Sequence, residues 1–101
     1  MLRKNLLVPF MQLFIQTKKT PNPDFLKFLP NGKVVMGDQG TVDMPTEESA
    51  IKHSELGRKL FKVEGVTRVF YGPNYISISK SERSDWNFLK PMIFDLIQEH
   101  Y

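Results

Sequence analysis

A chain of 101 residues with 41% hydrophobic and 12% aromatic residues can form one folded core, and this composition argues against global disorder. No apolar run approaches the roughly 18 residues that a membrane-spanning helix needs, so we expect a soluble protein with no membrane partner. The absence of cysteine excludes disulfides, thiol catalysis and thiolate-bound iron–sulfur or zinc sites within this chain.

The formal net charge of +3 at pH 7 is distributed unevenly along the chain. Residues 1–23 contain four bases and no acid, residues 24–84 contain nine bases and eight acids, and residues 85–101 contain one base and three acids. A phosphate-binding face needs Lys and Arg clustered on folded structure. The basic character belongs to the N-terminal end, and the charge on the rest of the chain is typical of a solvated surface.

The first eleven residues, MLRKNLLVPFM, are basic, apolar and free of acids. Such a composition is typical of a mitochondrial presequence, but the segment is short and poor in serine. A frayed tail before the internal Met11 explains it equally well. We therefore treat residues 1–11 as an N-terminal tail, with a targeting remnant as one of two open interpretations, and residues 12–101 as one domain.

Alternating side chains predict a first strand at residues 13–17 and a second at residues 25–29. Between them lies the corner Thr20-Pro21-Asn22-Pro23, where each proline fixes its own φ and disfavours a helix at the preceding residue. We expect this corner to hold the connection between the two strands rigid. After the turn at residues 30–32, the apolar residues 34–36 are predicted to extend the sheet.

Ser54 is a good N-cap for a helix at residues 55–62, and its apolar stripe predicts that Leu60 and Phe61 lie in the core. Thr46 caps only a short turn before it. Residues 66–71 and 75–79 are β-branched, aromatic or alternating, and the tight connection between them predicts a β-hairpin.

The last helix is predicted at residues 85–100, capped by Ser84 or Asp85, with Trp86 packed against the core. Pro91 lies inside this segment, so either the main helix begins there or it runs through with a kink. The resulting fold class is α+β, a two-layer sandwich in which an antiparallel sheet carries two main helices on one face, in the order ββαββα. The helical stripe comprises Leu89, Ile93, Leu96 and Ile97.

Catalytic and metal-binding patterns are scarce. The two histidines, His53 and His100, lie far apart in the sequence, and a metal site built from Asp38, Asp43 and His53 has no standard ligand spacing. The glycines match neither a phosphate-binding loop nor a dinucleotide motif. We therefore predict no catalytic, cofactor-binding or metal-binding residue, and no enzyme activity.

Aromatic residues of the hairpin offer one alternative function. Phe70, Tyr71 and Tyr75, with Arg68 and Lys80 nearby, are superficially like a stacking platform for single-stranded nucleic acid. The competing interpretation is that these aromatic side chains line the core and brace the hairpin. A small basic α+β nucleic-acid-binding domain is kept as the alternative, although nucleic acid is not the expected partner.

A series of short motifs in one order resembles the N-terminal domain of the Nfu family, found in mitochondrial and bacterial NifU-like iron–sulfur proteins. The resemblance covers roughly residues 13–100 with little gapping. Glu55 stands where the family often has proline, and both residues suit the first position of a helix. The motifs are Phe14-Ile15-Gln16-Thr17, Thr20-Pro21-Asn22-Pro23, Leu26-Lys27-Phe28, Ser54-x-Leu56, Leu60-Phe61, Glu64-Gly65-Val66, Val69-Phe70, Gly72-Pro73, Ile76, Asp85-Trp86-Asn87 and Leu89-Lys90-Pro91.

The resemblance implies a protein of iron–sulfur cluster assembly or delivery, in which a second domain with a Cys-x-x-Cys motif binds the cluster. This chain has no cysteine, so it resembles the non-catalytic module, which docks partners or positions a cluster-binding domain present in cis or in trans. The implied partners are iron–sulfur assembly or recipient proteins. The implied location is mitochondrial in a eukaryote and cytoplasmic otherwise.

Four residues are candidates for partner contacts. Asn22 and Asp24 lie at the proline corner, and Arg68 and Tyr71 lie in the predicted hairpin. The corner is a recurrent feature of the family that the chain resembles, and its polar residues are placed to face a partner.

Overall fold

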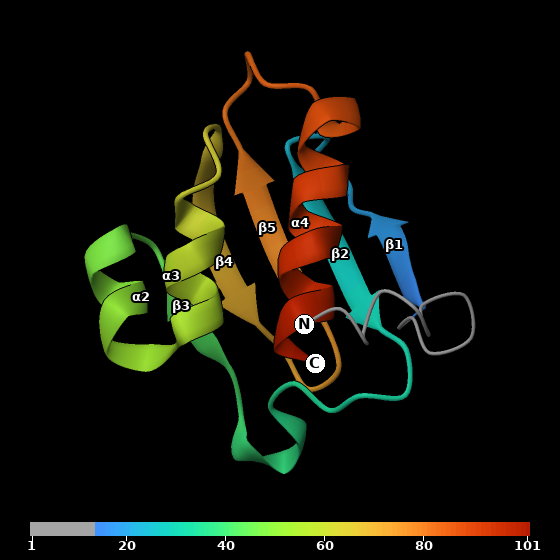
Figure 1. Cartoon of the computed structure of the whole chain (residues 1–101), viewed down its shortest axis with the longest axis vertical. Coiled ribbons are helices and arrows are strands. Elements are labelled where there is room, and N and C mark those ends of the chain that lie inside the picture. The colour runs from blue at the N-terminus through green and yellow to red at the C-terminus, as the bar shows by residue number, and fades with distance from the viewer. Residues whose placement is uncertain (1–13) are drawn as a thin grey trace, which may run out of the picture.

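A five-stranded antiparallel sheet forms one layer of the computed structural model, which describes residues 14–101. The three helices pack on one face of this sheet, as Figure 1 shows, so the predicted two-layer α+β class is confirmed. The strand order is β1-β2-β5-β4-β3. The strands are β1 (Ile15–Lys19), β2 (Phe25–Pro30), β3 (Val42–Met44), β4 (Val66–Tyr71) and β5 (Ile76–Lys80), and the helices are α2 (Glu47–His53), α3 (Glu55–Phe61) and α4 (Trp86–His100), with a 3₁₀ turn η1 (Gly37–Gln39).

Strand β3, which the sequence did not predict, lies outside the segment 34–36 where an extension of the sheet was expected. Residues 34–36 form a loop instead, and the backbone N–H groups of Val35 and Met36 donate to the carbonyl oxygen of Pro73, at 3.0 and 3.1 Å. Strand β3 follows η1 and pairs with β4, with Val42 opposite Tyr71. The prediction for residues 34–36 was wrong because a run of three apolar residues shows no alternation that separates a strand from a loop.

Helix α2 was predicted only as a short turn. Thr46 and Ser49 form a capping box, in which the Ser49 N–H donates to Thr46 Oγ1 at 3.1 Å and the Thr46 N–H donates to Ser49 Oγ at 3.2 Å. This pair satisfies two N–H groups that a helix start leaves open. The observed order differs from the predicted ββαββα order because strand β3 and helix α2 lie between β2 and α3.

Helix α3 ends within one residue of its prediction, but only one of its two expected core residues is central. Leu60 is fully buried, whereas Phe61 is half-buried at the edge of the core. Successive helical residues are rotated by about 100°, so the face that presents Leu60 to the sheet turns Phe61 aside. The expectation that Phe61 is a core residue equal to Leu60 is corrected accordingly. The core also contains Leu26, Phe28, Met44, Leu56, Val69, Ile76, Ile78, Leu89, Ile93 and Ile97.

Helix α4 runs through Pro91 without interruption, so the predicted alternative in which the main helix begins at Pro91 is wrong. Asp85 caps it by accepting a hydrogen bond from the Asn87 N–H at 2.9 Å. Its buried residues recur every four positions and lie over the centre of the sheet, where the ring of Phe28 packs against the rings of Trp86 and Phe94 at 6.1 and 5.8 Å. Among the described helices, none combines the length and the apolarity required to cross a bilayer.

Candidate interaction surfaces

The proline corner between β1 and β2 is held by its own side chains. Thr20 Oγ1 accepts a hydrogen bond from the Asn22 N–H at 3.2 Å and lies 2.8 Å from the Asn22 carbonyl oxygen. Asn22 Oδ1 accepts a hydrogen bond from the Asp24 N–H at 3.0 Å, which is a side-chain turn of the type that asparagine favours. Asn22 is exposed, so it is the predicted partner residue with free access to solvent at this corner.

Asp24 serves to fasten the corner to the rest of the fold. Its carboxylate accepts a hydrogen bond from Lys80 Nζ at 2.9 Å, and the Lys80 side chain is only 9% exposed. The indole N–H of Trp86 donates to the carbonyl oxygen of Pro23 at 3.0 Å. The corner is therefore joined to the end of β5 and to the first turn of α4, and Trp86 packs as predicted.

Arg68 and Tyr71 lie on β4, two strands from β2, and their environments differ from each other. Arg68 forms a two-pronged ion pair with Asp43 on β3, at 2.9 and 2.5 Å, and these hydrogen bonds lower the pKa of the Asp43 carboxyl. Tyr71 is 8% exposed, and its hydroxyl lies 2.5 Å from Ser54 Oγ at the cap of α3. The four predicted partner residues therefore do not form one surface.

The hairpin aromatics are divided between the two faces of the sheet. Tyr71 faces the helices, whereas Phe70 and Tyr75 stack on the opposite face, with their ring centres 6.3 Å apart. Lys27 Nζ lies 4.4 Å from the centre of the Tyr75 ring, and Lys80 is occupied by Asp24 on the helix side. Only part of the stacking platform considered for nucleic acid therefore lies on one face of the sheet, and this alternative is not favoured.

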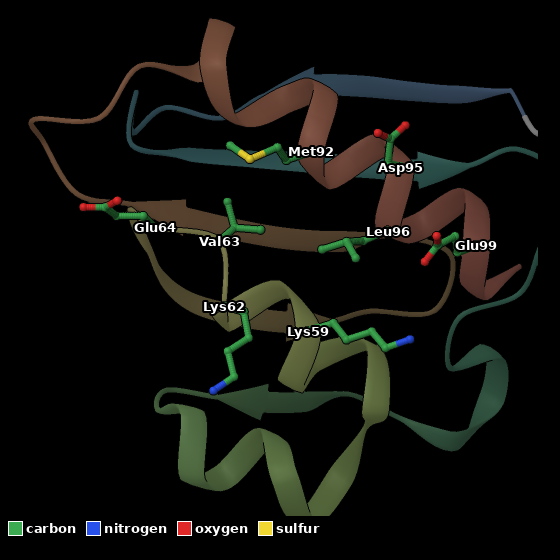
Figure 2. A pocket seen from close by; sticks show the side chains of 8 residues that line it. All are labelled: Lys59, Lys62, Val63, Glu64, Met92, Asp95, Leu96 and Glu99. Carbon is green, nitrogen blue, oxygen red and sulfur yellow. The ribbon is translucent and has the colours of Figure 1, made fainter.

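An open groove between α3 and α4 is a surface that the sequence did not predict. It encloses about 540 Å³, and Figure 2 shows that its side chains come from α3, the segment just after α3, and α4. Apolar residues occupy its centre and charged residues its borders. The groove is lined by Lys59, Lys62, Val63, Glu64, Met92, Asp95, Leu96 and Glu99.

The two sides of this groove differ in electrostatics. On the α3 side, the lysines have acidic neighbours: Lys62 Nζ lies 2.7 Å from a carboxylate oxygen of Glu47, and Lys59 Nζ lies 3.8 Å from one of Glu55. On the α4 side, Asp95 and Glu99 take part in no ion pair within the described part of the chain. The sequence analysis treated these charged side chains as solvated. No sequence motif shows that the sides of α3 and α4 pack together.

Metal-ligating side chains do not gather in residues 14–101: no three His, Cys, Asp or Glu side chains are grouped to hold an ion. Asp43, considered for a metal site, is paired with Arg68. The features that the fold does present are a fastened corner, an uncovered sheet face and a charged apolar groove. Residues 14–101 therefore form a small α+β domain in which no catalytic or metal-binding cluster is assembled.

Comparison with known proteins is consistent with this class. The family described as the N-terminal part of the scaffold protein Nfu/NifU matches residues 15–101. The human mitochondrial "NFU1 iron-sulfur cluster scaffold homolog" is 47% identical over 94 residues, which is 92% of this chain and 36% of that protein. The corresponding protein of Drosophila persimilis is 47% identical over 89 residues, which is 88% of this chain and 31% of that protein.

Solved structures show the same fold. A NifU-like protein from Saccharomyces cerevisiae matches with a TM-score of 0.77 and 30% identity, covering 87% of this chain and 77% of the other. A Staphylococcus aureus protein matches with a TM-score of 0.70 at 20% identity, covering 86% of this chain and 99% of the other, which supports the fold alone. The chain belongs to the Nfu/NifU N-terminal family of iron–sulfur scaffold proteins, and it spans about a third of the length of the curated relatives that it matches.

Proposed function

We propose that this chain is a non-catalytic module of an iron–sulfur cluster assembly or delivery protein, and that it docks partner proteins or positions a separate cluster-binding domain. Its family membership supports the assignment to cluster assembly. The observation that carries the docking role is the α3–α4 groove, an apolar hollow of about 540 Å³ bordered by charge, on a chain that has no cysteine.

The groove is the first candidate for the docking surface, and the exposed Asn22 is a second contact point at the proline corner. Asp24, Arg68 and Tyr71 are bonded to Lys80, Asp43 and Ser54, so a partner would have to displace those bonds to reach them. The proposed partners are iron–sulfur assembly or recipient proteins and the Cys-x-x-Cys domain that the family resemblance implies. The mitochondrial relatives support a mitochondrial location in a eukaryote, with a cytoplasmic location otherwise.

The test is a cluster-transfer assay with and without this module. A cluster-loaded Cys-x-x-Cys domain of the kind that the family resemblance implies is mixed with an apo recipient, either alone or fused behind this chain. Transfer is followed by the visible spectrum of the cluster. We expect the fused form to transfer faster, and we expect this chain added in trans to bind the recipient or the cluster-binding domain. Identical transfer rates, together with no measurable binding to either protein, would reject the docking role.

A further inference from the structure

We infer that the α3–α4 groove binds an amphipathic α-helix of a partner protein whose apolar stripe is bordered by a basic edge, and that this edge lies over Asp95 and Glu99 of α4. The inference rests on the proposed docking function and adds the chemistry of the docked element. Figure 2 shows the two acidic side chains on α4, beside the apolar residues at the centre of the groove.

The apolar centre consists of Val63, Met92 and Leu96. Met92 is 45% exposed although it lies in a concave surface, and Leu96 is partly buried, so the groove leaves apolar area that a partner can cover. Methionine is unbranched and flexible, and it adapts to the shape of an incoming apolar side chain. Covering this apolar area favours binding, and the entropy lost on association opposes it.

Secondary structure in the walls of the groove favours a helix over an extended peptide. One long wall is helix α4, and the other is the last turn of α3 with the segment 62–64 that follows it. The backbone groups of α4 are engaged within the helix, and the N–H groups of Lys62 and Val63 donate to carbonyl oxygens of α3. An extended peptide placed on this apolar floor would find no strand edge with which to pair its backbone groups, and unpaired groups are costly once water is removed. A helix satisfies its own backbone and presents only side chains.

The charge on α4 selects a basic edge. Asp95 and Glu99 are one helical turn apart, and like charges at this spacing repel each other. Glu99 also lies in the last turn of α4, where the helix dipole disfavours negative charge. Neither carboxylate has an ion-pair partner among residues 14–101, so a row of Lys or Arg from a partner would relieve both unfavourable interactions.

On the opposite wall of the groove, the positive charges of the lysines are already balanced by nearby carboxylates. Lys59 and Lys62 face Glu55 and Glu47, so they offer little net attraction to an acidic ligand. The chain as a whole carries a formal charge of +3, which by itself would attract acidic peptides. If the chain binds a basic helix more tightly than an acidic one, its overall positive charge cannot be the cause. The local charge of the groove would then explain the preference.

The probes are three synthetic peptides with the same leucine stripe. Each peptide is held in a helical conformation by a covalent cross-link between side chains. One has lysines along an edge of the stripe, one has glutamines there, and one has glutamates. Each is titrated into the ¹⁵N-labelled full chain at low and at physiological ionic strength. We expect the lysine peptide to bind about three- to tenfold more tightly than the glutamine peptide, as two exposed ion pairs would give. The glutamate peptide should bind weakest, and shifted amides should border the groove.

A charge reversal with a matched control separates the groove from general electrostatics. The double variant Asp95→Lys/Glu99→Lys should prefer the glutamate peptide. The control Asp38→Lys/Glu82→Lys changes the same residue types and the same total charge at exposed positions outside the groove, and it should keep the wild-type preference. A parallel measurement of unfolding by urea establishes that both variants are folded.

Several results would overturn the inference. They are equal binding of the three peptides, no binding of any, amide shifts centred on Phe70 and Tyr75, or self-association that covers the groove. A shift of the groove amides when residues 1–11 are deleted would mean that the chain's own basic segment is the occupant. If recipient proteins bind the Asp95→Lys/Glu99→Lys variant as tightly as the wild type, the groove inference fails while the docking function stands. If the wild-type chain itself binds no recipient protein, the docking function is rejected.

Discussion

Leu60 and Phe61 are adjacent residues of α3 that differ in how much of each side chain the fold buries. We predict that Leu60→Ala lowers the free energy of unfolding by about 2–5 kcal/mol, because it opens a cavity between α3 and the sheet. Phe61→Ala should cost less, because part of its ring already contacts water. Urea unfolding of the two variants checks this order. A larger loss of stability for Phe61→Ala would show that the core-facing side of α3 has been assigned incorrectly.

Gly65 precedes β4 with a φ of 104°, in the region that side chains disfavour. A Cβ there would lie 2.4 Å from Ser84 Oγ, so Gly65→Ala combines backbone strain with a steric clash. Gly32, with a φ of 79° and no atom within 4 Å of an added Cβ, provides a control with strain alone. We predict that Gly32→Ala costs about 1–2 kcal/mol and that Gly65→Ala costs clearly more. Equal thermal midpoints for the two variants would contradict the close approach of Ser84.

The buried phenol of Tyr71 predicts a loss of stability in alkali. Burial raises the pKa of Tyr71 above its usual value of 10.0, so the folded state holds this proton more tightly than the unfolded chain. Its contribution is complete below pH 10.0 and declines as the pH rises through the folded-state pKa. Tyr71→Phe should lower stability at neutral pH by removing the bond to Ser54 and should flatten the alkaline decline.

Chemical denaturation between neutral pH and about pH 11 measures this profile. Tyr101→Phe is the appropriate control, because burial also raises the pKa of Tyr101 but its hydroxyl does not bridge to the α3 cap. The neutral-pH cost should therefore be specific to Tyr71→Phe. An unchanged alkaline slope in Tyr71→Phe would show that its proton is not held by the fold.

At the scale of elements, the corner between β1 and β2 is a fastening point for three segments. Asp24 and Lys80 are coupled across it, and the low exposure of Lys80 makes an unpaired ammonium costly there. We predict that Asp24→Asn and Lys80→Met each destabilise the fold, and that their coupling in a double-mutant cycle is about 0.5–3 kcal/mol.

The exposed pair of Asp43 and Arg68 is the control for this cycle, because solvent and salt screen it. Asp43→Asn and Arg68→Met should show a smaller coupling, and adding salt should reduce that coupling further. A coupling for Asp24 and Lys80 no larger than that of the exposed pair would mean that this ion pair does not fasten the corner.

The sequence predicts elements where periodicity is long enough to be distinctive. The hairpin of β4 and β5, helix α3 and helix α4 each show alternation or a helical stripe, and their positions are confirmed. Strand β3 was missed because it is only three residues long. Helix α2 was predicted only as a short turn because it buries a single residue, Ala50. The groove was missed for a different reason, since Lys59 and Asp95 lie far apart in the sequence and only the packing of α3 against α4 brings their side chains to one hollow.

At the scale of the whole molecule, the donor set predicts that this chain alone retains no iron–sulfur cluster. Cluster iron needs thiolates, or histidines that replace two of them, and this chain has no cysteine and two exposed histidines, His53 and His100. After anaerobic reconstitution with iron and sulfide and then desalting, we expect no stoichiometric sulfide and no visible absorption band.

Carboxylates such as Asp43 or Glu64 would hold ferrous iron only loosely, and a mild chelator should remove it. The matched control is the same procedure applied to a Cys-x-x-Cys domain of the kind that the family resemblance implies, which should retain its cluster. Stoichiometric sulfide on this chain after desalting would contradict the assignment of cluster binding to a separate domain.

The strand order β1-β2-β5-β4-β3 has a consequence for how the protein is made. The hairpin of β1 and β2 leaves the ribosome before the other described elements. Strand β2 also pairs with β5, and the chain between them includes β3, both short helices and β4. A lone two-stranded hairpin is marginally stable, and pairing over such a sequence distance is slow. Helix α4, the last of the described elements in chain order, covers the centre of the sheet. A nascent chain that stalls before α4 therefore exposes the apolar face built on Phe28 and Ile78 to aggregation.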